Sequence, residues 1–362
     1  MKTCTSTNTA IAPKADSENR AKHIQITGDD QTSILELLAL SSSLTKSTIK
    51  TAAQKGAVWL SKLANKPEQK TEYPNSAQSI DKTTKTKKAE RIRRLKRPLK
   101  SHEQVDFYYN PDVLESVTPK AQCLFDGKEY SVWLKPRGMF SQGSKWGDFS
   151  ALYRWVELYF QNLGEPRQSW IVHRLDRATR GLMIIAHSKS MARDFSQQFE
   201  QGKIHKIYQA NVRGNFLKTI TTIDSPIPAG GFQIVYENQS QQISHILVTD
   251  KVDGKDALSE ISMLHYCAEN DISRLKITLH TGRKHQIRKH LAFLNSPIIG
   301  DRLYGNIVLS EPQSISLDAH DLQLTAYSLS WTCPLDNQLK EITLSEHQLD
   351  LLSCQNATDV AS

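Results

Sequence analysis

The sequence lacks the features that mark several large classes of protein. No run approaches the roughly 18 apolar residues of a membrane-spanning helix. The first twenty residues, MKTCTSTNTAIAPKADSENR, have no apolar stretch between a basic start and a cleavage site, so we expect no secretory signal there. The five cysteines, at positions 4, 123, 267, 333 and 354, have neither metal-site spacing nor an even count. We therefore expect a cytoplasmic protein with reduced cysteines.

Motifs for nucleotide cofactors and metals are equally scarce. No glycine-rich phosphate-binding turn joins a predicted strand to a helix, which argues against a dinucleotide-binding domain. His285 and His290 lie five residues apart, which is poor spacing for a shared ion on a helix, and no cysteine or carboxylate stands close to them. We therefore expect no metal site.

The sequence does have an excess of positive charge in its first hundred residues. These carry 20 Lys and Arg against 9 Asp and Glu, whereas the remainder carries 26 against 29. The excess peaks in KTKKAERIRRLKRPLK (85–100), where nine of sixteen residues are basic. This segment is either a solvated linker or a polyanion-binding segment, because guanidinium groups form forked bonds to phosphate. The candidate phosphate contacts in it are Arg91, Arg93, Arg94 and Arg97.

The N-terminal region predicts a small basic α/β domain behind a tail. Residues 1–27 are polar and aperiodic, so we expect disorder there. The domain itself is expected over 28–112, with an irregular polybasic insertion at about 63–100. Within it, the pattern predicts two helices, the second capped by Thr45 and ended by Gly56, then a strand at VWL and another at 102–110.

The rest of the chain predicts one large mixed α/β domain over 113–350, followed by a tail (351–362). Apolar alternation or continuous apolar runs indicate strands, and three-to-four-residue spacing of apolar positions indicates helices. The predicted strands are 130–139, 181–188, 206–214 and 274–282, and the predicted helices are 151–164, 190–202 and 283–295.

One aspartate stands out in the stretch VHRLDRATRG (172–181), just before a predicted buried strand. The arginines around Asp176 favour its ionised form. Loops held by a rigid scaffold often carry reactive groups, so Asp176 is a candidate reagent. A structural ion pair is the alternative, and this stretch alone leaves both open.

Two further stretches supply candidate site residues. LHTGRKHQIRKHL (279–291) predicts a helix starting after Gly282, whose free N–H groups and basic side chains suit a phosphate or carboxylate. A solvated basic face is the alternative. KIHKIYQANVRG (203–214) predicts a strand in which Tyr208 either stacks on a base or packs in the core.

The motifs HRLDRATRGLMIIA, KIYQANVRG and LHTGRKHQIRKHLAFLNSPIIGDRLYG resemble, in this order, those of the RluA-like pseudouridine synthases. LKPRGM (134–139) resembles the first motif of that family. The resemblance covers roughly residues 125–335. The N-terminal region resembles, more loosely, the small RNA-binding domain that many such synthases carry. One departure is Thr179-Arg180-Gly181, where the family usually has Thr-Ser-Gly.

The resemblance implies a pseudouridine synthase fold, with a central mixed, mostly antiparallel sheet flanked by helices. It also implies isomerisation of uridine to pseudouridine in ribosomal or transfer RNA, without a metal or an organic cofactor. Asp176 matches the essential aspartate of the family. Tyr208 matches a tyrosine that packs on the uracil and serves in the final proton removal, and Arg288 matches the basic residue that pairs with the aspartate.

Other residues are implied to bind RNA or to shape the site. Arg174 matches an arginine that helps fill the space left by the flipped nucleotide, and Ile287 and Leu182 are implied to form apolar walls. Arg283 and His285 are expected to contact the RNA backbone or shape the site, and Arg180 either contacts an RNA phosphate or faces solvent.

RNA is the implied partner, and no obligate protein partner or membrane is expected. One competing hypothesis is a catalytically silent RNA-binding or ribosome-assembly protein that retains the fold. It predicts the loss of Asp176 or Tyr208, and both are present. Another is a metal-dependent hydrolase using His173, His285 and His290, which lacks a carboxylate to complete its ligands.

Overall fold

The computed structural model describes residues 21–63, 89–222, 231–237, 242–305 and 321–352. Predictions for 1–20, 64–88 and 353–362 lie outside these residues. The chain divides into two compact units, one of residues 1–117 and 143–149 and one of residues 118–142 and 150–362. The first unit thus ends at 117 rather than at the predicted 112, and it includes a later segment. Within the described ranges, no helix is both long and apolar enough to cross a membrane.

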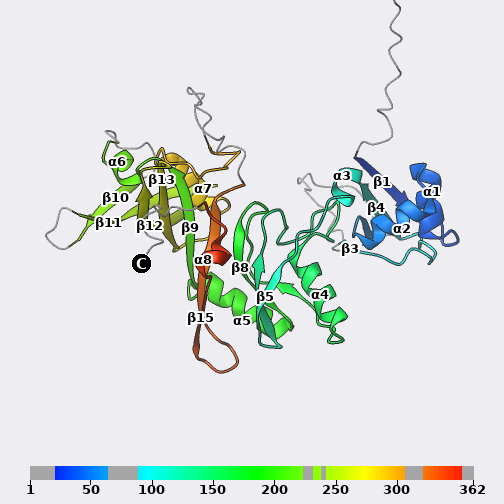
Figure 1. The fold of residues 1–362 in the computed structure, drawn as a ribbon. Helices are drawn as coiled ribbons and strands as arrows, with labels where there is room; N and C mark the ends of the chain where they lie inside the picture. Colours follow the sequence, from blue (N-terminus) through cyan, green and yellow to red (C-terminus); the bar gives the residue numbers. More distant parts are fainter. Residues whose placement is uncertain (1–20, 64–88, 223–230, 238–241, 306–320, 353–362) are drawn as a thin grey trace, which may run out of the picture. The chain divides into compact units, whose positions relative to one another are not determined.

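The first unit contains a four-stranded antiparallel sheet in the order β1-β4-β2-β3 (Figure 1). Two helices, α1 and α2, pack against it. Each is capped by a side-chain hydroxyl that accepts a hydrogen bond from a backbone N–H. Ser33 caps α1, and Thr45 caps α2, as predicted. The element bounds are β1 Lys22–Thr27, α1 Ile34–Ser42, α2 Lys46–Gln54, β2 Val58–Lys62, β3 Glu90–Arg91, β4 Glu103–Tyr109 and α3 Pro111–Leu114.

Two predictions for this unit are wrong. Residues 22–27 form β1 instead of part of a disordered tail, because Ile24 and Ile26 pack against the core while β4 pairs with the strand. Residues 89–100 are largely irregular, as predicted, but they are part of the core of this unit and not an insertion, since they contain β3 and bury Leu95 and Leu99. Basic residues surround both leucines and hide the apolar spacing.

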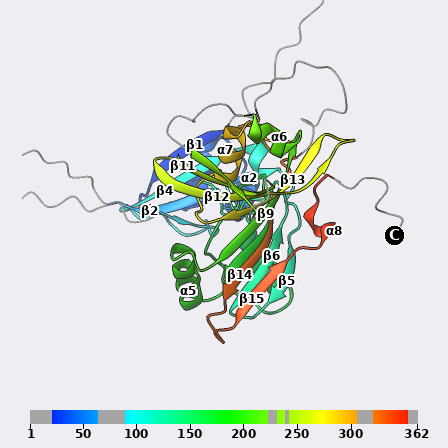
Figure 2. The same cartoon turned by 90° about the vertical axis from the view of Figure 1, so that its left-hand side faces the viewer.

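The second unit is built on a large mixed, mostly antiparallel sheet, as predicted (Figures 1 and 2). The strand order is β10-β11-β12-β13-β9-β14-β8-β6-β5, with β15 paired to β14 and β7 paired to β8. The strands are β5 Gln122–Asp126, β6 Tyr130–Lys135, β7 Trp170–Ile171, β8 Arg180–Ala186, β9 His205–Arg213, β10 Gly231–Tyr236, β11 Ile243–Val252, β12 Lys255–Cys267, β13 Ile272–Leu279, β14 Leu324–Thr332 and β15 Leu339–Thr343. The helices are α4 Leu152–Asn162, α5 Lys189–Glu200, α6 Phe216–Thr221, α7 Gln286–Phe293 and α8 Glu346–Leu349.

Strand β8 is covered on both faces, which explains its continuous apolar run. Met183 and Ile185 belong to one core cluster, which also contains Tyr208 and Ile287. Leu182 and its neighbours Ile184 and Ala186 belong to a separate cluster on the other side. The predicted role of Leu182 as a wall of the site is therefore wrong, because alternate residues of a strand point to opposite faces.

Strands β8 and β14 make the parallel contact that joins the two halves of this sheet, with Gly181 opposite Ala326. Gly181 has a φ of +132°, and a Cβ built on it would lie 2.4 Å from the carbonyl oxygen of Ala326. Only glycine therefore lets the two backbones approach this closely. The position matters for function because Asp176 lies only a few residues before it.

We predict that Gly181→Ala lowers the free energy of unfolding by about 3 kcal/mol or more, since the new methyl group meets backbone atoms of β14. Gly202→Ala is the matched control, because Gly202 also has a positive φ (+67°) but nothing within 4 Å of the added carbon. It should cost only about 1 kcal/mol. Urea unfolding of both variants tests this, and equal losses would contradict the close-approach explanation.

Candidate active site

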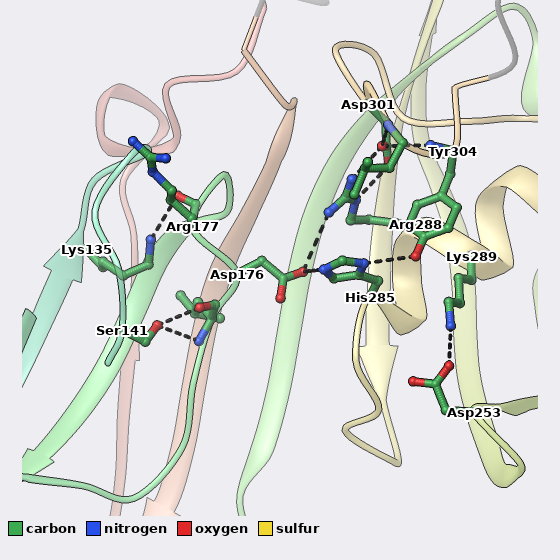
Figure 3. A network of polar contacts seen from close by, with 12 residues as sticks. Lys135, Ser141, Asp176, Arg177, Asp253, His285, Arg288, Lys289, Asp301 and Tyr304 are labelled. Atoms are coloured by element: carbon green, nitrogen blue, oxygen red, sulfur yellow. Dashed lines mark hydrogen bonds and ion pairs between the residues drawn. The ribbon is translucent and has the colours of Figure 1, made fainter. Parts of the chain in front are cut away.

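Asp176 lies in the loop that leads into β8, and backbone contacts fix this loop on both sides of it (Figure 3). The Ser141 hydroxyl accepts a hydrogen bond from the N–H of Leu175 (2.9 Å) and donates one to the carbonyl of Leu175 (2.5 Å). On the other side, the N–H of Gly138 donates to the carbonyl of Arg177. The carboxylate is 24% exposed, so it is held firmly but remains accessible.

A buried lysine also supports this loop, through hydrogen bonds to backbone carbonyls. Lys135 ends β6, and its ammonium group donates to the carbonyls of Pro136 (3.1 Å), Met139 (2.9 Å) and Arg177 (3.5 Å). Burial lowers the pKa of Lys135 to about 7, although the charge of Asp176 acts in the opposite direction. Lys135 therefore ties the Lys-Pro turn to the backbone beside Asp176.

Arg288 approaches Asp176 but binds another carboxylate more closely. Its Nε and Nη2 donate a forked pair of bonds to Asp301, at 2.8 and 2.6 Å, whereas its Nη1 lies 3.9 Å from Oδ2 of Asp176. Burial, the largest single effect, lowers the pKa of Arg288, but the bond to Asp301 together with the charges of Asp301 and Asp176 outweighs it and the net pKa is raised. The predicted pairing with Asp176 thus exists as a longer contact of an arginine that Asp301 holds in place.

His285 is part of this network rather than a surface residue. Its Nε2 lies 3.5 Å from Oδ2 of Asp176, and its Nδ1 lies 2.9 Å from the hydroxyl of Tyr304 (Figure 3). Burial lowers the pKa of His285 more than the charge of Asp176 raises it. A neutral imidazole between a carboxylate and a phenol is therefore favoured near neutral pH.

Helix α7 begins at Gln286, three residues later than predicted, and this changes the predicted anion site. Residue 285 has left-handed backbone angles, and the side-chain carbonyl of Gln286 accepts bonds from the N–H of Arg283 and the hydroxyl of Thr281. The helix start expected at Gly282, with its free N–H groups, is therefore wrong.

A pocket opens beside Asp176 and combines apolar and charged walls. Tyr208 on β9, together with Leu175, Leu279, Ile287 and Leu324, supplies the apolar part. Arg174, Arg283 and Lys284 are exposed cations on its lining, and Asp176, His285 and Arg288 form the polar end. Burial, followed by the charge of Asp176, raises the pKa of Tyr208, so its hydroxyl stays neutral. A planar base on an anionic backbone suits such a pocket.

The chain is also similar in sequence to known proteins of one family. The family model for RNA pseudouridylate synthase matches residues 129–293. An uncharacterized RNA pseudouridine synthase of Aquifex aeolicus is 30% identical over 267 residues, covering 71% of this chain and 80% of the relative. The dual-specificity RNA pseudouridine synthase RluA of Haemophilus influenzae is 30% identical over 225 residues, covering 60% and 90%. The chain belongs to the RluA family of RNA pseudouridine synthases.

This membership confirms the predicted family and enzyme class. The ribosomal large subunit pseudouridine synthase D of Borreliella burgdorferi is 33% identical over 189 residues, which cover 51% of this synthase and 54% of the relative. The chain thus spans about half the length of that relative. The mixed, mostly antiparallel fold described above is also the fold that the sequence predicted.

Several predicted site residues of this synthase lie away from the pocket or are engaged elsewhere. Arg180 donates its Nε to the carbonyl of Gln348 and lies 3.8 Å from Asp350, so it helps to hold α8. His173 accepts a hydrogen bond from the N–H of Ile184 and stacks on Phe199. The bond from Ile184 occupies the lone pair of Nε2, which gives His173 a structural role and weakens the metal-hydrolase hypothesis. Burial lowers the pKa of His173 to about 3, so the ring is neutral.

The arginines of the polybasic segment differ sharply from one another. Arg93 donates two bonds to the buried Asp148, and Arg97 pairs with Glu103. Arg91 stacks on Trp59 and bonds to the carbonyl of Gly56. Arg94 and Lys96 are exposed, and neither makes a hydrogen bond or ion pair within the described ranges of the chain.

The sequence interpretation missed four supporting residues of the site, and a signal existed for some of them. Asp301 and Tyr304 belong to the quoted Gly-Asp-x-x-Tyr-Gly motif, and Lys135 belongs to the quoted Lys-Pro turn. Their motifs were visible, but their roles depend on contacts between distant segments. Ser141 lies in no quoted motif, and the sequence contains no signal for it.

We predict that Asp301→Asn lowers the free energy of unfolding by about 3 kcal/mol, because it removes the buried counter-charge in direct contact with Arg288 and leaves only the more distant Asp176. Asp253→Asn is the matched control. Asp253 pairs at 2.7 Å with Lys289, which follows Arg288 in the same helix, but the Asp253 side chain is 60% exposed. Its loss should cost less than about 1 kcal/mol. Chemical denaturation measures both, and similar values would contradict a structural role for the buried pair.

Proposed function

We propose that this synthase isomerises a specific uridine in structured RNA, with the Asp176 carboxylate as the reacting group. The observation that carries the proposal is the convergence of Asp176, Tyr208 and Arg288 on one pocket from three separate segments. A carboxylate that is held on both sides and accessible from an apolar pocket suits attack on, or proton abstraction from, a ribose.

The reaction requires a balanced exchange of bonds at the base. The bond from the ribose to the ring nitrogen breaks, a bond to a ring carbon forms, and the proton of that carbon leaves while the nitrogen gains one. Asp176 either forms a transient bond to the sugar or removes a sugar proton, and in both routes the guanidinium of Arg288 lies close to the carboxylate, at 3.9 Å from Oδ2.

Tyr208 is the residue on which the uracil packs. Its ring lies in the apolar part of the pocket, and the base reaches it only after leaving its stack in the RNA. The raised pKa of Tyr208 favours the neutral hydroxyl, so the packing role has more support than the predicted part in proton removal.

RNA contacts beyond the flipped base are assigned to exposed cations. Arg174, Arg283 and Lys284 lie on the pocket lining, where phosphates next to the flipped nucleotide would pass. Relatives are named for ribosomal RNA and for transfer RNA, as in synthase D of Borreliella burgdorferi and tRNA pseudouridine synthase C of Haemophilus ducreyi. The target of this synthase is therefore proposed as a uridine in one of these two RNA classes.

A catalytically silent RNA-binding protein is the competing function, and it has less support. Such a protein has no need for the hydrogen bonds by which Ser141 and Lys135 fix the backbone on either side of Asp176. Two buried polar side chains, Ser141 and Lys135, hold this one loop in place, and this favours a catalytic role for Asp176.

We predict that Asp176→Asn abolishes pseudouridine formation, by a factor of about 10⁴ or more, and leaves RNA affinity within about threefold. The amide has the same shape, but it can neither bond covalently to the sugar nor accept its proton. Asp336→Asn, at an exposed aspartate of the second unit, is the control and should keep parental activity. Product formation by Asp176→Asn at the parental rate would overturn the assignment.

The polybasic segment supplies a second prediction. Of its four candidate arginines, only Arg94 is exposed without an intramolecular partner in the described part of the chain, and Lys96 resembles it. Replacing both with glutamine should weaken RNA binding and reduce the slope of log affinity against log salt by about 1.5. Fluorescence titration at several salt concentrations measures the slope.

Arg93→Gln serves as the contrasting variant in that experiment. It breaks the bonds to the buried Asp148, so it should lower stability and leave the salt slope unchanged. A slope that responds to Arg93→Gln and not to the Arg94 and Lys96 replacements would contradict this division of roles.

A further inference from the structure

His285 occupies a position from which it acts on one oxygen of the reacting carboxylate. Its Nε2 lies 3.5 Å from Oδ2 of Asp176, and Arg288 also approaches Oδ2, at 3.9 Å. Within the described residues, no side chain makes a polar contact with Oδ1. The two oxygens of this carboxylate therefore have different surroundings, and Oδ1 is the one free to meet a substrate.

The ring of His285 has one proton when neutral, and its two neighbours decide where that proton lies. A carboxylate only accepts hydrogen bonds, so a favourable contact with Asp176 needs the proton on Nε2. Nδ1 is then an acceptor, and the Tyr304 hydroxyl, 2.9 Å away, must donate to it. Tyr304 thus selects the tautomer that suits Asp176.

His285 and Tyr304 are both held in place by backbone geometry and hydrogen bonds, not by chance surface contacts. His285 has left-handed backbone angles (φ 56°, ψ 24°) and immediately precedes α7, whose first residue is fixed by hydrogen bonds of Gln286 to Leu258 and Ser259. The N–H of Tyr304 donates to Asp301, and the Tyr304 ring lies 5.1 Å from the guanidinium of Arg288. The same buried aspartate therefore fixes both Arg288 and Tyr304.

The charged groups that act on His285 are Asp176 and Asp301 on one side and Arg288 and Lys284 on the other. The two carboxylates raise the pKa of His285, the two cations lower it, and burial, the largest effect, lowers it further and so favours the neutral ring. The hydrogen-bond arrangement of Tyr304, His285 and Asp176 thus stays intact through neutral pH. A protonated ring would have two N–H donors, and its Nδ1 would no longer accept a hydrogen bond from the Tyr304 hydroxyl.

We propose that Tyr304 and His285 form a positioning pair, in which Tyr304 fixes the Nε2–H form of His285 and His285 holds Oδ2 of Asp176 so that Oδ1 faces the uridine. This inference rests on the proposed role of Asp176. Neither residue exchanges a proton with the substrate, so both are positioning residues. A contact of 3.5 Å is longer than a formed hydrogen bond, and catalytic contacts of this kind commonly tighten when the substrate binds.

The tautomer is tested directly by ¹⁵N spectra of histidine-labelled protein, without any RNA turnover. The signals that disappear in His285→Gln identify His285 among the 12 histidines. We expect a single neutral form protonated at Nε2 in the parent protein and a mixture of both forms in Tyr304→Phe. Tyr266→Phe, which removes a hydroxyl bonded to Asp271 at 2.9 Å, is the control and should leave the spectrum of His285 unchanged. An Nδ1–H form in the parent protein would overturn the proposal.

The functional part is tested by a double-mutant cycle. Glutamine at 285 also offers an N–H donor, but its amide has no tautomer for Tyr304 to select. Tyr304→Phe should therefore slow single-turnover pseudouridine formation about five- to tenfold in the parent background and less than about twofold in His285→Gln. RNA affinity should not change in either background. His285→Leu, which has no donor, should be slower than His285→Gln.

The substrate for the cycle is total RNA from cells that lack this synthase. Equal fold losses from Tyr304→Phe in the two backgrounds would refute the pair, because a merely structural tyrosine acts independently of residue 285. Failure of the proposed function has a different signature. In that case Asp176→Asn would retain activity, whereas the tautomer measurement would be unaffected.

Discussion

The buried ion pair between Arg288 and Asp301 is the interaction on which the rest of the site depends. Asp301 is wholly buried and accepts four hydrogen bonds, two from Arg288 and two from the backbone N–H groups of residues 303 and 304. It thereby fixes the cation beside Asp176 and the phenol that binds His285. Removing such a pair from water costs free energy, so the pair serves here to position Arg288 and Tyr304 rather than to add net stability.

The reacting carboxylate is fixed from the opposite direction by a different set of groups. Ser141 and Lys135 hold the backbone on either side of Asp176, and Gly181 allows the strand behind it to pair closely with β14. The carboxylate and its cation therefore come from two separately supported segments that meet at the polar end of the pocket (Figure 3). The apolar part of the pocket beside them is where we place the base, next to charged groups that are already fixed, as a pre-organised site requires.

Sequence patterns predicted the helices and strands well wherever apolar spacing was regular, as at α4, α5 and β8. They failed where local chemistry competed with the pattern. Charged neighbours hid the buried Leu95 and Leu99, and Gln286 shifted the start of α7 by bonding to Arg283. Asp176, Tyr208 and Arg288 could be selected from motifs, and the structure brings them to one pocket. The partners Asp301 and Tyr304 could not be assigned, because their roles arise from contacts that spacing along the chain does not encode.

The central claim is that this pocket makes pseudouridine at defined positions in cellular RNA. The most direct measurement is a transcriptome-wide map of pseudouridine in cells with and without this protein, followed by incubation of the deficient RNA with the purified synthase. The account predicts that one or a few uridines in ribosomal or transfer RNA lose the modification in the deficient cells and regain it in vitro. An identical map in both cell lines, with no modification added by the purified protein, would contradict it.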